Sequence, residues 1–458
     1  MVTPLSRPRP RAARSAAQRA AAASEIPLAV RRARQQQQQG LVAEPPAVPS
    51  HFVCPISLDL MRDPVTAPTG ITYDRDSVER WLERGRATCP VTGAPLRPEE
   101  LVPNHATRRV IQEWCVANRA LGVERVPTPR VPVSAADASD LLATVSDAAG
   151  SRDGPACRQL AARVRALGKE SERNRRCIAA AGAAGALSSA FFQLVDQPVG
   201  TALTASGALE EILAALVVVF PLDDESRRRI ASLASLDAVV AILSHGEVAA
   251  RVSAVVVLRE IASSSDSQCL DAMSKANGIY DALIKLLEKP LSTQATKAAL
   301  VTAYYLATNT GDAASCLVDL GMVQLVVELL VDADKGTTEK ALAVLDTLLL
   351  TEEGRGKAYA HALAVPVLVK KMQHVSDMAT EFAVSALWRL CKNLSGEGQC
   401  KAEALQVGAF QKLLLLLQVG CMGVTKERAS ELLRLLNGSR GSVECIETVD
   451  FKGLKRPF

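Results

Sequence analysis

The chain has 458 residues, of which 48% are apolar, 22% charged and only 3% aromatic. This length favours more than one domain, and the apolar fraction excludes a chain that is disordered throughout. The net charge of +4 argues against a whole-protein polyanion binder. Apolar residues that are mostly Ala, Leu and Val favour helices, and no apolar run reaches the roughly 18 residues of a membrane span.

Residues 1–50 combine eight arginines and two acids with an alanine cluster, several prolines and the run Gln35–Gln39. They hold few periodic apolar positions, so we expect a disordered basic tail. An acid-poor start with Arg and Ser also resembles an organelle transit peptide, which leaves targeting open. Eleven dispersed cysteines and the lack of a secretory apolar region favour reduced thiols. We expect a cytoplasmic protein, with the nucleus as the alternative.

Residues 51–120 differ in kind, because they combine turn residues with two short helical patterns. A hairpin return at 69–75 leads into a helix that starts at about Asp74 or Asp76, carries Trp81 and ends at Glu83. Asn104 is predicted to cap a last helix.

A metal site is the first interpretation of this module. Cys54-Pro-Ile-Ser57 and Cys89-Pro-Val-Thr92 look like two zinc knuckles whose second cysteine is replaced by a hydroxyl residue. Structural zinc takes four Cys or His ligands, and hydroxyls are poor substitutes for thiolates. The module offers too few ligands for a two-zinc RING domain: His51, Cys54, Cys89, His105 and Cys115. We therefore expect no metal and no other cofactor.

Residues 121–136 form a proline-bearing linker, and amphipathic helices follow from 137 to 437. A sequence motif, in which a small residue precedes an apolar helical segment, recurs at Gly278, Gly321 and Gly408. Weaker copies begin at Gly185, Ala234 and Ala364, which gives steps of 49, 44, 43, 43 and 44 residues. This period predicts an armadillo or HEAT solenoid with a concave groove, and the glycine favours the armadillo form.

The longest step predicts an insertion around Gln197–Thr204, and residues 438–458 are expected to be a C-terminal tail. The repeats contain no catalytic constellation, since their histidines stand alone at His245, His361 and His374. Six cysteines are predicted to be small core residues of the helices: Cys157, Cys177, Cys269, Cys316, Cys391 and Cys400.

An ordered set of motifs in residues 51–120 resembles the U-box, a zinc-free relative of the RING fold. The set comprises Phe52-Val-Cys-Pro-Ile-Ser-Leu58, Asp63-Pro-Val65, Gly70-Ile-Thr-Tyr-Asp-Arg75, Trp81, Cys89-Pro-Val-Thr92, Leu96, Pro103-Asn104 and Ile111-Gln-Glu-Trp114. With the repeats, the architecture from 51 to 437 is similar to the plant U-box/armadillo ubiquitin ligases. The implied fold class is mainly α, with a small α+β U-box before an armadillo-repeat α-solenoid.

The resemblance implies a ubiquitin transferase that forms no covalent intermediate and needs no acid or base of its own, because it works by positioning a loaded conjugating enzyme. The implied conjugating-enzyme surface comprises Ile56, Leu58, Trp81, Pro90 and Gly93. For Ile56 and Trp81 an ordinary core position is the alternative. The polar network that replaces zinc would comprise Cys54, Ser57, Asp74, Cys89 and Thr92, with Asp74 either in the network or capping the helix.

Gly93 departs from the family, which often has a basic or polar residue there that bridges conjugating enzyme and ubiquitin. The expected partners are a ubiquitin-loaded conjugating enzyme and a protein substrate in the armadillo groove, with no nucleic acid. The chain is compatible with either a monomer or a homodimer. The resemblance to the family suggests a role in plant stress or defence signalling. The main alternative is a non-catalytic armadillo scaffold with a weakened U-box. The short, divergent repeats and the linked U-box argue against an importin-like carrier.

Overall fold

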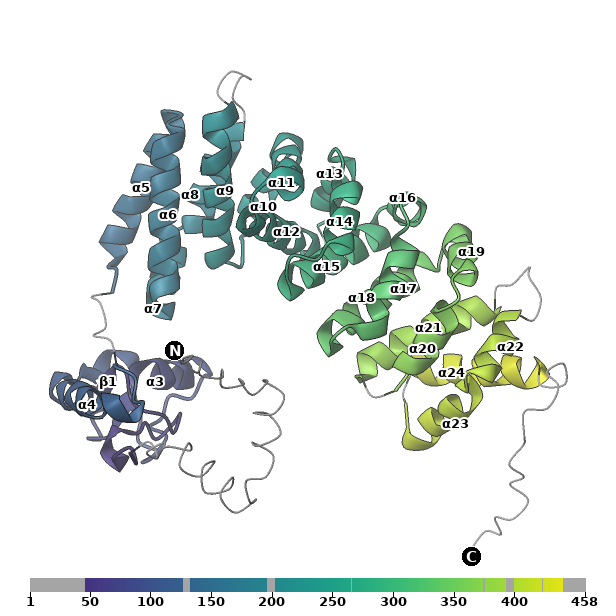
Figure 1. The fold of residues 1–458 in the computed structure, drawn as a ribbon. Helices are drawn as coiled ribbons and strands as arrows, with labels where there is room; N and C mark the ends of the chain where they lie inside the picture. Colours follow the sequence, from purple (N-terminus) through teal and green to yellow (C-terminus); the bar gives the residue numbers. More distant parts are fainter. Residues whose placement is uncertain are drawn as a thin grey trace, which may run out of the picture. The chain divides into compact units, whose positions relative to one another are not determined.

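The structure, a computed structural model, describes residues 46–126, 132–195, 202–264, 266–373, 375–392, 399–421 and 423–439. The predicted tails at 1–50 and 438–458 lie almost wholly outside the described residues, as does His374. The expected insertion at Gln197–Thr204 and the linker at 121–136 lie partly outside them. The chain divides into two compact units, Met1–Val131 and Pro132–Phe458 (Figure 1).

The first unit contains a small sheet with short helices around it. Its elements are η1 (Ser50–Phe52), β1 (Pro64–Thr66), β2 (Thr72–Asp74), α3 (Arg75–Glu83), η2 (Pro98–Glu100), β3 (Val102–Pro103), α4 (His105–Ala117) and η3 (Arg119–Leu121). The strands are antiparallel in the order β2-β1-β3, so β1 lies in the middle. Val65 at its centre pairs with both Tyr73 and Pro103 and is fully buried.

The helix predictions for this unit are confirmed. The first predicted helix is α3, which begins at Arg75, ends at Glu83 and carries Trp81. Asn104 caps α4, because its side-chain oxygen accepts a hydrogen bond from the Thr107 amide at 2.9 Å. Ile111 of α4 is buried in a core that belongs to this unit alone, so the unit has its own hydrophobic centre.

The second unit is built from helices only, among the residues that the structure describes. It opens with α5 (Ala135–Gly150) and α6 (Gly154–Glu170). Three groups of three helices follow: α7 (Glu172–Ala180), α8 (Ala183–Val195), α9 (Ala202–Val218), α10 (Asp224–Ile230), α11 (Leu233–His245), α12 (Val248–Ser263), α13 (Ser267–Lys275), α14 (Ile279–Glu288) and α15 (Thr293–Asn309). Three more complete the unit: α16 (Ala313–Asp319), α17 (Met322–Asp332), α18 (Lys335–Leu348), α19 (Glu352–Ala360), α20 (Ala364–Lys371), α21 (Asp377–Lys392), α22 (Gln399–Gln406), α23 (Ala409–Val419) and α24 (Gly423–Ser439).

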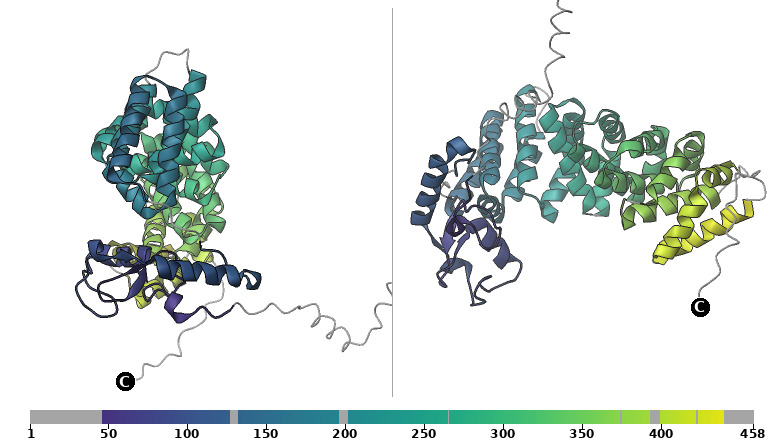
Figure 2. Two further views of the ribbon diagram at one scale, coloured as in Figure 1. Left: turned by 90° about the vertical axis from the view of Figure 1, so that its left-hand side faces the viewer. Right: turned by 60° about the horizontal axis from the view of Figure 1, so that its bottom comes forward.

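The groups of the second unit stack in chain order, so each packs against its neighbours (Figure 2). The third helices α9, α12, α15, α18, α21 and α24 contact one another in a row. The second helices from α8 to α20 form a parallel row, and a continuous apolar core lies between the elements. One group could not bury its apolar face alone, so stacking is what makes each group stable.

The predicted glycine turns are confirmed at the three strongest copies of the repeat. Gly278, Gly321 and Gly408 precede α14, α17 and α23 with φ of 73°, 89° and 82°. This left-handed backbone suits glycine, which has no Cβ to clash, and it turns the chain sharply into the next helix. The weaker copy at α20 instead begins after Leu363, whose φ is −94°.

The predicted helical cysteines are mostly core residues. Four of them are buried and Cys177 and Cys316 are half-buried, and the ten cysteines in the described ranges are all free thiols. Within those same ranges, no single helix combines the length and apolarity needed to cross a membrane. Two sharply bent helix pairs, α7 with α8 and α16 with α17, reach that length and composition together.

Candidate functional site

The first unit presents a tight turn at residues 54–59 whose tip is an exposed leucine. The Cys54 amide donates to the Asp59 carbonyl at 2.9 Å, and the Leu58 amide donates to the Cys54 carbonyl at 2.9 Å. An antiparallel bridge between Val53 and Leu60 closes the turn. Leu58 has φ of 61° and its surface is 76% exposed. A left-handed leucine costs roughly 1–2 kcal/mol, so this residue is both strained and directed to solvent.

A second turn repeats the first with an offset of 35 residues. The Cys89 amide donates to the Ala94 carbonyl at 2.7 Å, and the Gly93 amide donates to the Cys89 carbonyl at 2.8 Å. A bridge between Thr88 and Pro95 closes it. Gly93 therefore occupies the position of Leu58, with φ of 72° and open space where a Cβ would stand.

Trp81 ties the second turn to helix α3. Its indole Nε1 donates to the Thr88 carbonyl at 2.8 Å, directly before the turn. The Arg86 guanidinium lies over the ring, 4.4 Å from its centroid, in a cation–π contact. The half-buried Trp81 thus supports the turn with one edge and keeps part of its ring accessible.

The residues predicted for the conjugating-enzyme surface lie on these two turns and on α3. Leu58 and Gly93 are exposed, whereas Ile56, Trp81 and Pro90 are half-buried. Val91 was not among the predicted residues, although it is 55% exposed and stands in the second turn where Ile56 stands in the first. The parallel between Cys-Pro-Ile-Ser and Cys-Pro-Val-Thr was the signal that could have found it.

Asp74 connects the first turn to strand β2. Its Oδ1 accepts hydrogen bonds from the amides of Arg62 (2.8 Å) and Asp63 (2.9 Å), and its own amide donates to the Cys54 Sγ at 3.2 Å. The backbone of Asp74 precedes α3, but its side chain makes no capping bond to that helix. Burial raises the pKa of Asp74, although the two amides favour its charged form. Of its two predicted roles, the structure therefore supports the polar network.

A second polar cluster surrounds Cys89. The Tyr73 hydroxyl lies 2.9 Å and the Thr69 hydroxyl 3.5 Å from the Cys89 Sγ. Burial alone would raise the pKa of Cys89, but hydrogen bonds from Thr92, Tyr73 and Thr69 outweigh it and lower this pKa to about 6. Burial and the hydrogen bond to Cys89 raise the pKa of Tyr73.

An ion-pair centre at Asp63 was not predicted. Its Oδ2 accepts from the Arg75 Nε at 2.7 Å, and its Oδ1 accepts from the Arg108 Nη1 at 3.1 Å. These side chains are only about a fifth exposed, so solvent screens the charges weakly. Asp63 therefore joins the β1 region to α3 and α4 at a single carboxylate. The Asn104 side chain adds a bond to the Thr66 hydroxyl at 3.0 Å.

The comparisons with known proteins match both units. Residues 48–120 match the U-box domain, and residues 139–455 match the family described as "Plant U-box protein ARM repeat region". The chain belongs to the plant U-box/armadillo family. "U-box domain-containing protein 21" of Arabidopsis thaliana is 37% identical over 413 residues, which is 90% of this chain and 93% of that protein.

Further relatives of this U-box/armadillo protein carry an activity in their names. "E3 ubiquitin-protein ligase PUB23" of Arabidopsis thaliana is 33% identical over 410 residues and covers 86% of this chain and 94% of its own length. Among solved structures, a designed armadillo repeat protein covers 54% of this chain and 98% of its own length, at 21% identity and a TM-score of 0.44.

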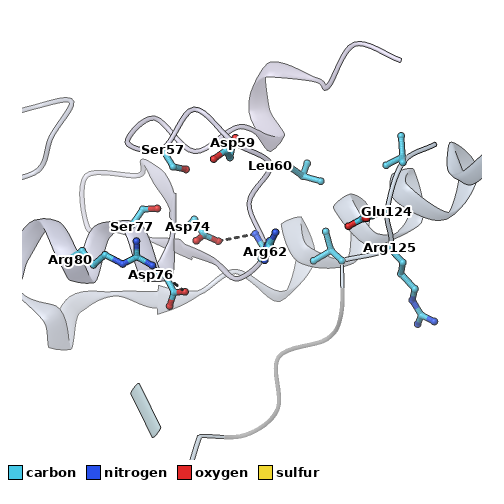
Figure 3. Close-up of a pocket in the computed structure, with 12 residues that line it drawn as sticks. Ser57, Asp59, Leu60, Arg62, Asp74, Asp76, Ser77, Arg80, Glu124 and Arg125 are labelled. Atoms are coloured by element: carbon cyan, nitrogen blue, oxygen red, sulfur yellow. Dashed lines mark hydrogen bonds and ion pairs between the residues drawn. The ribbon is translucent and has the colours of Figure 1, made fainter. Parts of the chain in front are cut away.

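The first unit also has a hollow of about 590 Å³ beside the first turn (Figure 3). Its walls come from the first turn and β2, from the start of α3 and from residues 123–126. The predicted network residue Ser57 is exposed there, because it lies near the tip of the turn, and the structure does not bring it into either cluster. The lining includes both acids, such as Asp59 and Asp76, and bases, such as Arg80, so the hollow favours neither sign of charge.

Proposed function

We propose that the U-box of this ubiquitin ligase binds a ubiquitin-loaded conjugating enzyme through its two turns and α3. The observation that carries the proposal is the pair of matched turns, which present apolar side chains to solvent. Leu58 keeps a left-handed backbone, with φ of 61°, although 76% of its surface is exposed. Strain that persists at an exposed residue is a feature of functional sites, and small apolar patches with a charged rim are typical interface centres.

Transfer of ubiquitin then depends on position alone. The substrate lysine amine attacks the thioester carbonyl, and the cysteine of the conjugating enzyme leaves as a thiolate. The U-box contributes by holding the loaded enzyme in a reactive arrangement, which lowers the entropic part of the barrier. Trp81 and Arg86 flank the second turn and would fix its orientation against the partner.

In this proposal, the armadillo repeats bind the protein substrate. Their third helices form a continuous row along the second unit, which is the surface that an extended segment of a substrate would follow. A cytoplasmic or nuclear location stays a prediction. A role in stress or defence signalling stays a prediction, as does a homodimer.

The assay is autoubiquitination with a promiscuous conjugating enzyme. We expect the Ile56→Ala/Pro90→Ala double variant to be at least fivefold slower, since truncating a central interface residue costs about 1–4 kcal/mol. Val116→Ala is the control, because this valine is also exposed but lies on α4. Unchanged transfer by the double variant would remove both residues from the interface.

The alternative, a scaffold with a weakened U-box, is favoured by Gly93, which has no side chain to bridge enzyme and ubiquitin. Deleting residues 140–458 separates the two functions. In the ligase, this deletion abolishes ubiquitination of the substrate and spares the synthesis of free ubiquitin chains, which needs no acceptor lysine on residues 1–139. A full-length protein that binds its partner but never discharges a loaded conjugating enzyme would establish the scaffold instead.

A further inference from the structure

A tryptophan in the row of third helices holds two cations at its ring. Trp388 lies on α21, which packs against both α18 and α24 (Figure 1). The Lys392 Nζ lies 4.5 Å and the Arg428 Cζ 5.4 Å from the centroid of its ring. The face of an aromatic ring attracts cations electrostatically. The half-buried Trp388 therefore keeps two positive groups together on the last two third helices.

A buried carboxylate of α18 connects these polar side chains across three third helices. Asp346 is 9% exposed, and its Oδ1 accepts hydrogen bonds from the Ser385 hydroxyl at 2.6 Å and from the Arg389 Nε at 2.8 Å. The Ser385 Oγ in turn accepts a hydrogen bond from the Arg428 Nη1 of α24 at 2.7 Å. This chain of bonds holds the guanidinium of Arg428 in place, so the group is preorganised for a ligand.

Arg428 has no carboxylate partner within the described part of the chain. There it donates to the Ser385 hydroxyl and lies over the Trp388 ring, but it forms no ion pair. A guanidinium has five N–H donors, of which the hydrogen bond to Ser385 uses one. A charge that is partly removed from water is costly unless it is paired. The remaining donors of the half-buried Arg428 are therefore suited to an anion from outside the repeats.

The charges around Trp388 do not balance. The Glu431 Oε2 accepts a hydrogen bond from the Trp388 Nε1 at 2.8 Å, and its Oε1 lies 3.0 Å from the Lys392 Nζ. The hydrogen bonds from Lys392 and Trp388 and the charge of Arg434 lower the pKa of Glu431, so this carboxylate is ionised at neutral pH. Two carboxylates thus face four cations, which leaves two positive charges. The carboxylates are Asp346 and Glu431, and the cations are Arg389, Lys392, Arg428 and Arg434.

Two exposed acids of the same helices do not neutralise these cations. Glu381 of α21 precedes Trp388 by seven residues, which is about 10 Å along a helix. Glu427 of α24 directly precedes Arg428, and consecutive side chains of a helix point about 100° apart. Neither acid forms an ion pair with a cation of the described ranges. The positive charge beside Trp388 is therefore available to a partner.

We propose that Trp388, Lys392 and Arg428 form a binding site for the carboxylates of an acidic segment of the protein substrate. A carboxylate of this segment pairs with the unused donors of Arg428 and lies beside Lys392. The planar donors of arginine match a carboxylate in a bidentate arrangement, and complementary charge selects an acidic segment over a basic one. This inference rests on the proposal that the repeats bind the substrate, and it names the class of substrate.

The experiment measures the binding of fluorescent peptides to the full-length protein by fluorescence anisotropy. The probes are a Glu-Ser repeat and, as controls of equal length, a Gln-Ser and a Lys-Ser repeat. We expect the Glu-Ser peptide to bind at least about tenfold more tightly than either control. The Lys392→Gln/Arg428→Gln variant should lose about tenfold or more of this affinity, because the carboxylates lose both cations.

The matched control is Lys426→Gln, which removes another exposed cation of α24. Lys426 stands two residues before Arg428, so its side chain lies on another side of the helix, and binding should change by less than about twofold. Circular dichroism of each variant checks that the repeats stay folded. If the double variant does not fold, Lys392→Gln alone tests the site, since this side chain is 43% exposed; it should weaken binding about threefold.

Three results would overturn this inference. Equal affinity for the Glu-Ser and Gln-Ser peptides would mean that carboxylates are not recognised, and tighter binding of the Lys-Ser peptide would assign the surface to basic segments. An equal loss of affinity in Lys426→Gln would reduce the effect to the general charge of α24. Synthesis of free ubiquitin chains by the same wild-type preparation tests the U-box separately. Normal chain synthesis without selective peptide binding would refute only the acidic substrate class, whereas selective binding without chain synthesis would support it and refute the ligase activity.

Discussion

Replacing Leu58 by glycine and by alanine separates folding from binding at the first turn. Both variants lose the same exposed side chain, and little packing goes with it because Leu58 is 76% exposed. They differ in the Cβ, which is strained at φ of 61°. A Cβ in this region costs roughly 1–2 kcal/mol, and the extra chain entropy of glycine offsets part of that. We therefore expect Leu58→Gly to be more stable than Leu58→Ala by about 1 kcal/mol.

Hydrogen exchange of the U-box peptides in the full-length protein measures this difference. About 1 kcal/mol corresponds to roughly fivefold slower exchange of the most protected amides in Leu58→Gly. Both variants should weaken binding of the conjugating enzyme alike, by about fivefold or more. Equal exchange in the two variants would contradict the left-handed geometry of Leu58. Binding as tight as that of the wild type would exclude this residue from the interface.

Further predictions concern the second turn and the charged centre of the U-box. Gly93→Arg should speed single-turnover discharge of a loaded conjugating enzyme onto free lysine about fivefold, through a net gain of about 1 kcal/mol from charge-assisted bonds. The same change should lower U-box stability by about 1 kcal/mol, because φ of Gly93 is 72°. A discharge rate equal to or below that of the wild type would mean that another residue bridges the conjugating enzyme and ubiquitin. Asp63→Asn should destabilise the U-box by about 2–4 kcal/mol, because two partly buried arginines lose their carboxylate. The control is Asp76→Asn, which breaks the exposed ion pair between Asp76 and Arg80 at 4.0 Å and should change stability by less than about 0.5 kcal/mol. Similar losses of stability in both variants would refute the role of Asp63. The pKa of Cys89 is lowered to about 6, so ionisation of this thiol should stabilise the folded state. The contribution should be complete above the unfolded-state pKa of about 8.5 and should disappear as the pH falls through 6. Relative to Cys89→Ser, the wild type should therefore lose about 2 kcal/mol between these pH values, and parallel stability curves in urea titrations would show that no thiolate forms.

Local signals predicted much of the fold. The Asn104 cap, the limits of α3 and the glycines before three apolar helices all act through neighbours in the chain, so the sequence shows them directly. The repeat period predicted the stacking of the helices, because each repeat must bury its apolar face against the next. The left-handed backbone of Leu58 could not be predicted this way, since leucine rarely adopts it. The second turn explains this backbone, because it has the same hydrogen bonds and places Gly93, which readily adopts a positive φ, at the position of Leu58.

The polar part of the site could be predicted only in outline. Resemblance alone selected the network residues Cys54, Asp74, Cys89 and Thr92. The structure places them in two clusters, one around Asp74 and Cys54 and one around Tyr73 and Cys89, and Tyr73 and Asp74 are successive residues of β2. The centre at Asp63 joins partners 12 and 45 residues away, and no periodic pattern marks such long-range pairs. Ser57 resembles a ligand position in sequence, but it lies near the tip of the turn and is exposed.

The separate cores of the two units affect how this protein can evolve. Among the described residues, the buried apolar side chains of the U-box and those of the repeats form two separate clusters, and each repeat packs against its immediate neighbours. A substitution on one turn of the solenoid therefore needs compensation only nearby. If the repeats bind the substrate, as proposed, a change in a single repeat would alter the target while the U-box stays the same, and a lineage of such ligases would diversify its targets without changing its transfer module.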